Sequence, residues 1–264
     1  MCTLAVYVRA TAEIPLLVAA NRDEFFLRPT AEPTVIAYRP VVFAGQDLSA
    51  GGTWFGVNQH GLVVGLLNRR QGTGLDSTRR SRGLLCLEVL QTRSPGEASA
   101  LLRAVRADAY NGFNLLVADA REAFVATNPS GHVQLTPLAA GVHLLTNLEL
   151  NDPTCPRIAK SSALFRDVAL PGADDIEQVI PSLRSILSDH STALDPRATT
   201  IDTLCVHLDG YGTRSSSIVA ITAGGRLRYW HAAGAPCRTD YAELPVDIAL
   251  HTAAASPTLV DPRN

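Results

Sequence analysis

The sequence lacks both a strong charge of one sign and any long apolar run. Its 264 residues carry 23 Lys and Arg against 25 Asp and Glu, which gives a formal net charge of −2. This balance argues against nucleic acid or an anionic membrane as a partner. No window approaches the roughly 18 apolar residues that span a bilayer, so we expect no transmembrane segment.

Cysteine is scarce, and its pattern argues against two kinds of cross-link. The five residues are Cys2, Cys86, Cys155, Cys205 and Cys237. Their odd number, their wide spacing and the lack of a C-x-x-C pair argue against a disulfide framework and against a structural zinc site. A reducing compartment suits such thiols best. Arg9 and Glu13 interrupt the first twenty residues, so we expect no signal peptide and a cytoplasmic protein.

The common cofactor motifs are missing as well. The seven histidines form no H-x-x-x-H or H-E-x-x-H pair. The segments GTGLDS and GYGTRS lack the third glycine of a dinucleotide-binding loop. We therefore expect neither a metal ion nor a cofactor.

The apolar content that is present predicts a strand-rich first third. Hydrophobic residues make up 46% of the chain, enough for one large domain or two small ones. Apolar runs at 3–8 and 14–20 favour a β-hairpin, and GGTWFGVNQHGLVVGLLN favours two strands around a turn at 59–61. The apolar residues of this second stretch are nearly continuous, which indicates strands covered on both faces.

Helices are expected in two pairs that alternate with groups of strands. The first pair covers 81–92 and a second helix that starts at the SPGE signal and runs to about 107. The second pair covers 156–168 and 174–187, where Pro181 must kink or break the helix. Since no linker or repeat interrupts this order, we predict one α+β domain over residues 1–246 and a mobile tail over 247–264.

Cys2 is the first candidate for chemistry. Its small side chain permits removal of Met1, after which one residue would hold a thiol and a free α-amine. These groups have reference pKa values of about 8.5 and about 7.7–8.0, so both titrate near neutral pH. The amine can take the thiol proton and later return it to a leaving nitrogen. The alternative is that Cys2 is merely a small residue that starts a strand.

Five further polar residues stand where strands end or turns begin: Arg22, Asp23, Asn68, Asn147 and Arg214. Arg22 near the thiol would favour the thiolate, and Asp23 would hold the α-ammonium, unless the two form a surface salt bridge. Asn68 and Asn147 would donate to an oxyanion, unless they serve only turn chemistry. Arg214 fits a substrate carboxylate, a structural fork or a catalytic charge.

The segments ANRDEF, GGTWFGVNQHGLVVGLLN, YNGFNLLVAD and GYGTRSSSIV resemble the NRDE-motif family, also called transport and Golgi organisation protein 2 homologues. The resemblance runs from Cys2 to about Trp230. That family is related to N-terminal-nucleophile hydrolases, which implies a four-layer αββα sandwich of two antiparallel sheets. Similarity to the choloylglycine hydrolase and acid ceramidase group implies cleavage of non-peptide amides by an N-terminal cysteine.

The resemblance also implies catalytic roles for Arg22, Asp23, Asn68, Asn147 and Arg214 beside Cys2. One departure stands out. The related hydrolases have Arg-Asn-x-Asp at the first cluster, whereas this chain has Asn-Arg-Asp-Glu at 21–24. The Arg and Asp side chains can therefore both take the hydrolase positions only with a bulge or a shifted register.

Two functions follow from the resemblance. The first is hydrolysis of a C–N amide bond through a Cys2 thioester, on a small-molecule amide or lipid-like ligand and without a cofactor. The alternative is a haem or acyl-lipid binding and trafficking protein that uses the same cleft without turnover, because a cysteine thiolate also ligates haem iron. The intact mass distinguishes a chain that has lost Met1 from one that has kept it.

Overall fold

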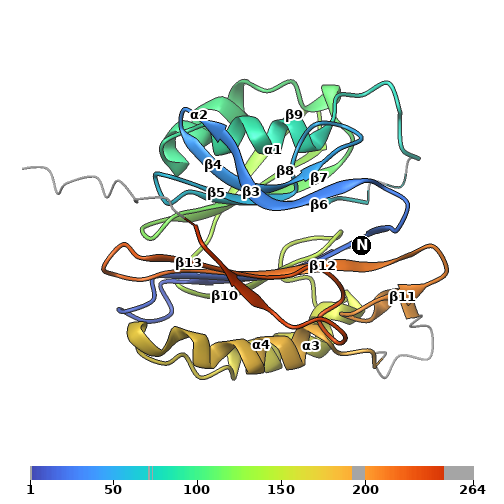
Figure 1. Cartoon of the computed structure of the whole chain (residues 1–264). Helices are drawn as coiled ribbons and strands as arrows, with labels where there is room; N and C mark the ends of the chain where they lie inside the picture. The colour runs from blue at the N-terminus through green and yellow to red at the C-terminus, as the bar shows by residue number, and fades with distance from the viewer. Residues whose placement is uncertain (1, 71, 73, 192–199, 247–264) are drawn as a thin grey trace, which may run out of the picture.

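The computed structural model describes residues 2–70, 72, 74–191 and 200–246, so the tail predicted at 247–264 lies outside the described residues. Two antiparallel sheets lie face to face, with α1 and α2 on the outer face of one and α3 and α4 on the outer face of the other (Figure 1). This is the predicted αββα arrangement. Within the described part of the chain, no helix is long and apolar enough to cross a membrane.

The first sheet takes strands from both ends of the chain, in the order β10-β1-β2-β12-β13-β14, with β11 paired to β12. Its strands are β1 (Thr3–Val8), β2 (Leu16–Phe25), β10 (Gly141–Leu145), β11 (His207–Leu208), β12 (Tyr211–Ile221), β13 (Leu227–Ala232) and β14 (Ala242–Leu244). The β1–β2 pair is the hairpin that the apolar runs predict. Residues far apart in the sequence thereby meet at the start of β1.

The second sheet runs in chain order from β3 to β9. Its strands are β3 (Thr30–Tyr38), β4 (Val41–Asp47), β5 (Phe55–Asn58), β6 (Val63–Asn68), β7 (Phe113–Ala118), β8 (Ala123–Ser130) and β9 (His132–Pro137). β3 is an edge strand that the apolar pattern did not predict. The turn expected at 59–61 does join β5 to β6, and Gly61 there has φ 77°.

Helices form where the start signals stand. They are α1 (Arg82–Leu90), α2 (Pro95–Ala104), α3 (Pro156–Arg166) and α4 (Ile180–Leu187), with 3-10 turns at η1 (Ala107–Ala109), η2 (Ala173–Val179) and η3 (Thr200–Asp202). At α2, the N-cap Ser94 accepts from the Glu97 amide at 3.2 Å, which is one half of a capping box. The Glu97 carboxylate accepts at 2.9 Å from the amide of Arg93, the residue before the N-cap. Pro181 lies in the first turn of α4, where a missing N–H costs nothing, so the expected break is the change from η2 to α4.

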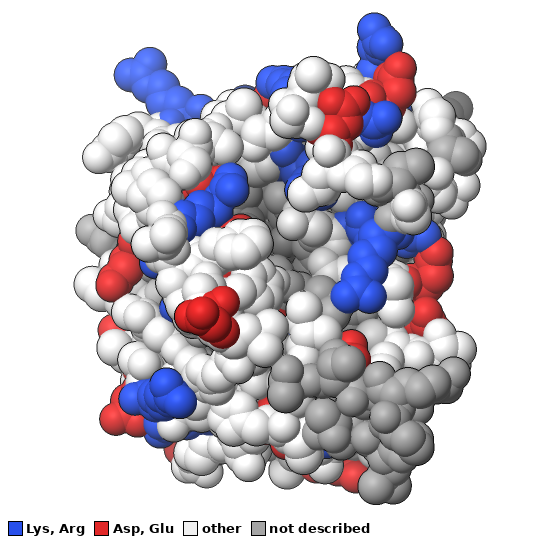
Figure 2. Space-filling view, turned by 90° about the vertical axis from the view of Figure 1, so that its right-hand side faces the viewer, with Lys and Arg blue, Asp and Glu red and all other residues white. Residues whose placement is uncertain are grey.

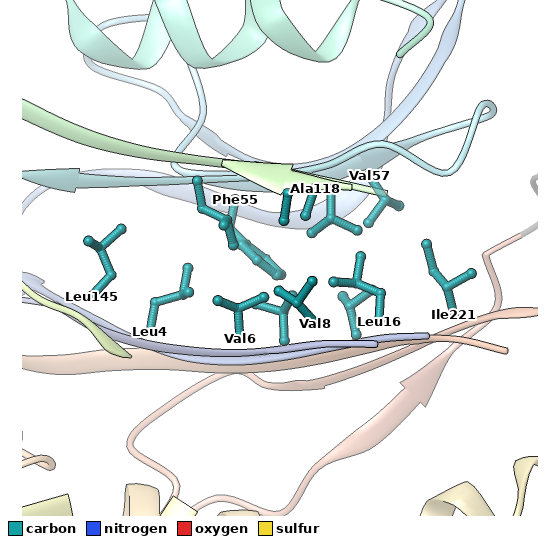
Figure 3. Close-up of a cluster of buried hydrophobic side chains, with 14 of the residues drawn as sticks. Leu4, Val6, Val8, Leu16, Phe55, Val57, Ala118, Leu145 and Ile221 are labelled. Carbon is teal, nitrogen blue, oxygen red and sulfur yellow. The ribbon is translucent and has the colours of Figure 1, made fainter. Parts of the chain in front are cut away.

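Alternation along the strands decides which side chains face the site. On β1, Leu4, Val6 and Val8 point into the core between the sheets (Figure 3), whereas Ala5 and Tyr7 pack against the helices. All six residues of β1 are buried, as expected for a strand covered on both faces. The side chains of β2 alternate in the same way, so neighbouring polar residues near its C-terminal end face opposite sides of the sheet.

Candidate active site

Cys2 lies just before β1, beside the polar end of β2. Its backbone nitrogen donates to Asn147 Oδ1 at 3.2 Å, and its Sγ lies 3.9 Å from the carbonyl oxygen of Asp23. The side chain packs against the core between the two sheets. The thiol and its own backbone nitrogen are therefore each held by a residue from a different strand region.

Asn147 joins the two sheets at this point. It follows β10, and its Nδ2 donates to the carbonyl oxygen of Asn68, which ends β6 in the opposite sheet. The amide orientation is determined by these partners, because the Asn68 carbonyl needs a donor and the Cys2 N–H needs an acceptor. Asn147 thus binds the Cys2 nitrogen through its oxygen. The side chain of Asn68 is exposed, and this residue contributes to the site through its backbone.

Asp23 faces the helix side of the first sheet and is fully buried. Its carboxylate accepts from Arg157 Nη1 at 3.0 Å and from Thr213 Oγ1 at 2.6 Å. Arg157, which is 1% exposed, also donates to Thr3 Oγ1 at 3.0 Å and to the Ile201 carbonyl at 2.7 Å. This network secures the ends of β1 and β2 behind Cys2.

Arg22 faces the opposite side, toward the second sheet. Its guanidinium carbon lies 4.0 Å from the ring centroid of Trp54, a cation–π contact, and its Nη2 lies 3.8 Å from Glu24 Oε2. Trp54 is held by a close approach of backbones, since a Cβ on Gly52 would lie 2.2 Å from the Gly83 carbonyl carbon of α1. The GGTW segment needs glycine at position 52 for that reason.

Two pockets meet at the Arg22–Trp54 contact. The inner one is lined by Cys2, Arg22, Trp54 and Ser215 among others, and leaves about 20 Å³ for the centres of water molecules. That is room for roughly one water. The outer one is polar, offers about 110 Å³, and is lined by the same Arg22, Trp54 and Ser215 together with His231. Figure 2 shows a hollow on the side of the molecule where the N-terminus lies, with basic side chains along its rim.

Arg214 occupies a bulge opposite the Arg22–Asp23 pair. The pairing of β12 with β2 places Thr213 opposite Asp23 and Ser215 opposite Arg22, so Arg214 is the extra residue between them. Its Nη1 donates to the carbonyl oxygens of Phe25, which ends β2, and of Phe26 and Arg28, which follow it. These contacts favour the structural-fork interpretation of Arg214. The register shift lies opposite the Arg22–Asp23 pair, and its extra residue belongs to β12 rather than to β2.

The electrostatic environment of Cys2 differs from the expected one. Burial raises the pKa of the Cys2 thiol, and this effect outweighs the opposing influence of the Arg22 guanidinium. Burial also lowers the pKa of Arg22 and of Arg82, and negative charge on Cys2 acts against that shift in both. In this form of the chain the expected gain in thiolate from Arg22 is therefore reversed by desolvation.

Of the six residues expected to act together, Cys2, Arg22, Asp23 and Asn147 meet here through their side chains or backbone, and Asn68 joins them through its carbonyl oxygen. Arg214 instead contacts the chain at the end of β2. Sequence reasoning missed Arg157, whose partner Asp23 lies 134 residues away. A signal existed in the helix pattern, because Arg157 stands on the same face of α3 as the buried Ile158, Ser161 and Phe165. An arginine on an apolar helix face needs a buried anion.

The sandwich and the cysteine at its strand end define a class of protein. The chain is similar in fold to a Caenorhabditis elegans N-acylethanolamine-hydrolyzing acid amidase ortholog, with a TM-score of 0.55 and 13% identity over 85% of this chain and 93% of that one. It is also similar to a mutant conjugated bile acid hydrolase from Clostridium perfringens, with a TM-score of 0.50 and 10% identity over 96% and 95%. The fold is that of the N-terminal-nucleophile hydrolases.

Sequence comparison is more specific than the fold. The family described as Transport and Golgi organisation 2 matches residues 1–233, and this chain belongs to it. The Transport and Golgi organization protein 2 homolog of Homo sapiens is 28% identical over 235 residues, which cover 81% of this chain and 84% of the relative. The Bos taurus homolog is 27% identical over 237 residues with the same coverage. The resemblance proposed from the motifs is thereby confirmed.

Proposed function

We propose that this protein is an amidohydrolase that cleaves a non-peptide C–N bond through a thioester on Cys2. The observation that supports this most is the pair of contacts at Cys2, with Asn147 on its nitrogen and the Asp23 carbonyl near its sulfur. In an N-terminal-nucleophile fold, Cys2 would need both its thiol, as the nucleophile, and its nitrogen, as the base. The proposal includes removal of Met1, which turns that nitrogen into an α-amine.

The steps follow from those two groups. The α-amine takes the Cys2 thiol proton, the sulfur attacks the amide carbonyl carbon, and a tetrahedral oxyanion forms. The C–N bond then breaks while the α-ammonium gives its proton to the leaving nitrogen, which releases the amine and leaves a thioester. Water, deprotonated by the same amine, attacks the thioester, and a carboxylic acid leaves as the thiol is restored. The free N–H of Asn147 Nδ2 and the exposed amide of Asn68 are the oxyanion donors in this proposal.

The substrate proposed is a small acyl amide that carries a carboxylate. Arg22 is a buried cation that lines both the pocket beside Cys2 and the outer pocket. Such guanidiniums bind carboxylates in bidentate geometry. The inner pocket holds about one water, so the acyl group must displace the Arg22–Trp54 contact to reach the sulfur.

Binding without turnover remains the competing function. A haem does not fit the cavity beside Cys2, whose free space of about 20 Å³ is far below the roughly 300–1,000 Å³ of sites that hold molecules of drug size or larger. We derive no role for haem iron. An acyl-lipid carrier would use the same pocket but would form no thioester.

We also place the protein in the cytoplasm as part of the proposal, since all five cysteines are free thiols.

The test pairs two substrates with the same acyl chain, an N-acylglycine and the N-acylethanolamine that lacks its carboxylate. We expect a trapped thioester on the peptide that contains Cys2, a higher kcat/KM for the N-acylglycine, and intact mass without Met1. Cys2→Ala should abolish turnover, whereas Cys86→Ala, which changes a thiol that lines neither pocket, should leave it unchanged. Saturable binding without any acid product, in protein shown to lack Met1, would support the carrier instead.

A further inference from the structure

A second group of reactive side chains lies apart from Cys2, at the edge of the first sheet. His190, Cys205, His207 and Cys237 each offer one donor atom, and these atoms all lie within 4.8 Å of one another. The two Sγ atoms are 3.6 Å apart, and His207 Nε2 lies 3.7 Å from Cys205 Sγ and 3.2 Å from Cys237 Sγ. Nothing in the proposed hydrolysis uses these residues.

The three separations among Cys205, His207 and Cys237 are close to the edges of a tetrahedron around zinc. Zn–S bonds of about 2.3 Å and Zn–N bonds of about 2.0–2.1 Å place neighbouring sulfurs about 3.8 Å apart and a sulfur and nitrogen about 3.6 Å apart. All three measured edges lie within a few tenths of an ångström of those values. A small motion of the side chains would bring them to bonding geometry.

The tautomer of His190 also suits a metal ligand. Its Nδ1 lies 3.0 Å from the carbonyl oxygen of Cys205. A carbonyl only accepts, so Nδ1 carries the proton and Nε2 keeps its lone pair. Backbone hydrogen bonds of this kind orient the imidazoles of zinc sites. The ring of His190 lies against that of His207, with centroids 4.9 Å apart.

We propose that His190, Cys205, His207 and Cys237 bind one Zn²⁺ as a closed structural site. Two thiolates and two neutral imidazoles fill all four positions, so no position stays open for substrate. The ligands come from three segments: the residues after α4, the segment that leads into β11, and the loop between β13 and β14. The ion would fasten these segments to one another.

A zinc ion at this position would also stabilise β2, because the segment around Cys205 contacts that strand and its neighbour β12. The two neighbours of Cys205 in the chain both contact the first sheet. The carbonyl of Leu204 accepts from Asn21 Nδ2 at 2.9 Å, and the carbonyl of Val206 accepts from the Thr213 amide at 2.9 Å. The segment that the ion would hold is thus a direct support of the strand that carries Asn21 and Asp23. This inference stands independently of the proposed amidohydrolase.

The experiment uses the full chain, reduced and freed of metal, titrated with Co²⁺ and then with Zn²⁺. We expect one Co²⁺ per chain with thiolate-to-cobalt charge-transfer and tetrahedral ligand-field bands, displaced by one Zn²⁺. X-ray absorption of the zinc form should give two sulfur and two nitrogen ligands. Cys237→Ser should weaken Zn²⁺ binding by about 100-fold or more, since even the loss of an outer-shell partner costs roughly 10–100-fold.

Two further variants guard against a folding artefact. Cys86→Ala removes a cysteine outside the group and should leave the cobalt spectrum unchanged. His190→Asn alters an exposed ligand, so the chain should fold, keep its two-sulfur charge-transfer band and bind more weakly. The proposal fails if the reduced wild-type chain takes up no Co²⁺, if Cys237→Ser binds as tightly as wild type, or if peptide mapping finds Cys205 and Cys237 joined as a disulfide in the chain as purified.

Discussion

Replacement of Arg157 by methionine should destabilise the protein far more than loss of a surface arginine. The change keeps most of the side-chain volume but removes a charged partner of Asp23, since Arg157 Nη1 lies 3.0 Å from the Asp23 carboxylate. Both side chains are 1% exposed or less. The buried carboxylate would keep the Thr213 hydroxyl at 2.6 Å as a neutral donor but would lose the charged hydrogen bond from Arg157.

The magnitude follows from the burial of the pair. Removal of one partner from a buried ion pair costs about 3–5 kcal/mol. At about 2–4 °C per kcal/mol for a chain of this size, Tm should fall by roughly 6–20 °C. The double variant Arg157→Met with Asp23→Leu removes both charges and should recover most of that loss, because a buried pair and an apolar replacement are often close in stability.

Guanidinium unfolding followed by circular dichroism measures these differences, with Tm from calorimetry as the second measurement. Arg106→Ala is the matched control, because Arg106 pairs with Asp108 at 2.9 Å on the surface, where the two are 82% and 60% exposed. This control should leave Tm unchanged. If Arg157→Met is no worse than the control, or if the double variant is as unstable as the single one, the buried pair does not support the site as argued.

Three further predictions concern other parts of the fold. Burial lowers the pKa of His231 from 6.5 to about 4. Between these pH values the unfolded chain binds a proton that the folded chain does not, so the free energy of unfolding should fall by about 3 kcal/mol as the pH drops from 6.5 to 4. His231→Gln should remove that slope in pH-dependent unfolding. Gly52→Ala should destabilise by about 1–3 kcal/mol or more, whereas Gly74→Ala, with open space around it, should not; urea midpoints compare the two. Arg214→Ala should release the loop at 25–28, and limited proteolysis should then cut there faster than in wild type; equal rates would contradict the bracing role.

The sequence predicted those parts of the fold that depend on neighbours in the chain. The β1–β2 hairpin and the helix start at SPGE both follow from residues within a few positions of one another. The edge strand β3 was missed because its burial follows no clear alternation and because Pro33 lies within it. An edge strand tolerates proline and needs no apolar face, so the pattern of a buried strand is absent there.

The sequence indicated residues that the structure brings close together, but it did not indicate the contacts that they make. The motifs identified Cys2, Arg22, Asp23 and Asn147, yet Asp23 turns toward Arg157 and Arg22 toward Trp54 because alternate residues of a strand face opposite sides. The wide spacing of the cysteines argued against zinc, but that argument considers only ligands close in sequence. Contacts between residues 205 and 237 arise from the pairing of β12 with β13 and the loop beyond.

The position of β1 has a consequence for the order of events during synthesis. β1 pairs with β2 along one edge and with β10 along the other, and the partner of Val8 in β10 is Gly141. At about 5–20 residues per second, some 130 residues of synthesis separate the two pairings by roughly 7–26 s. Under the removal of Met1 proposed above, an aminopeptidase would have access to the N-terminus during that interval, before β10 pairs with β1 and Asn147 accepts from the Cys2 nitrogen. Faster synthesis would shorten the time available for that removal.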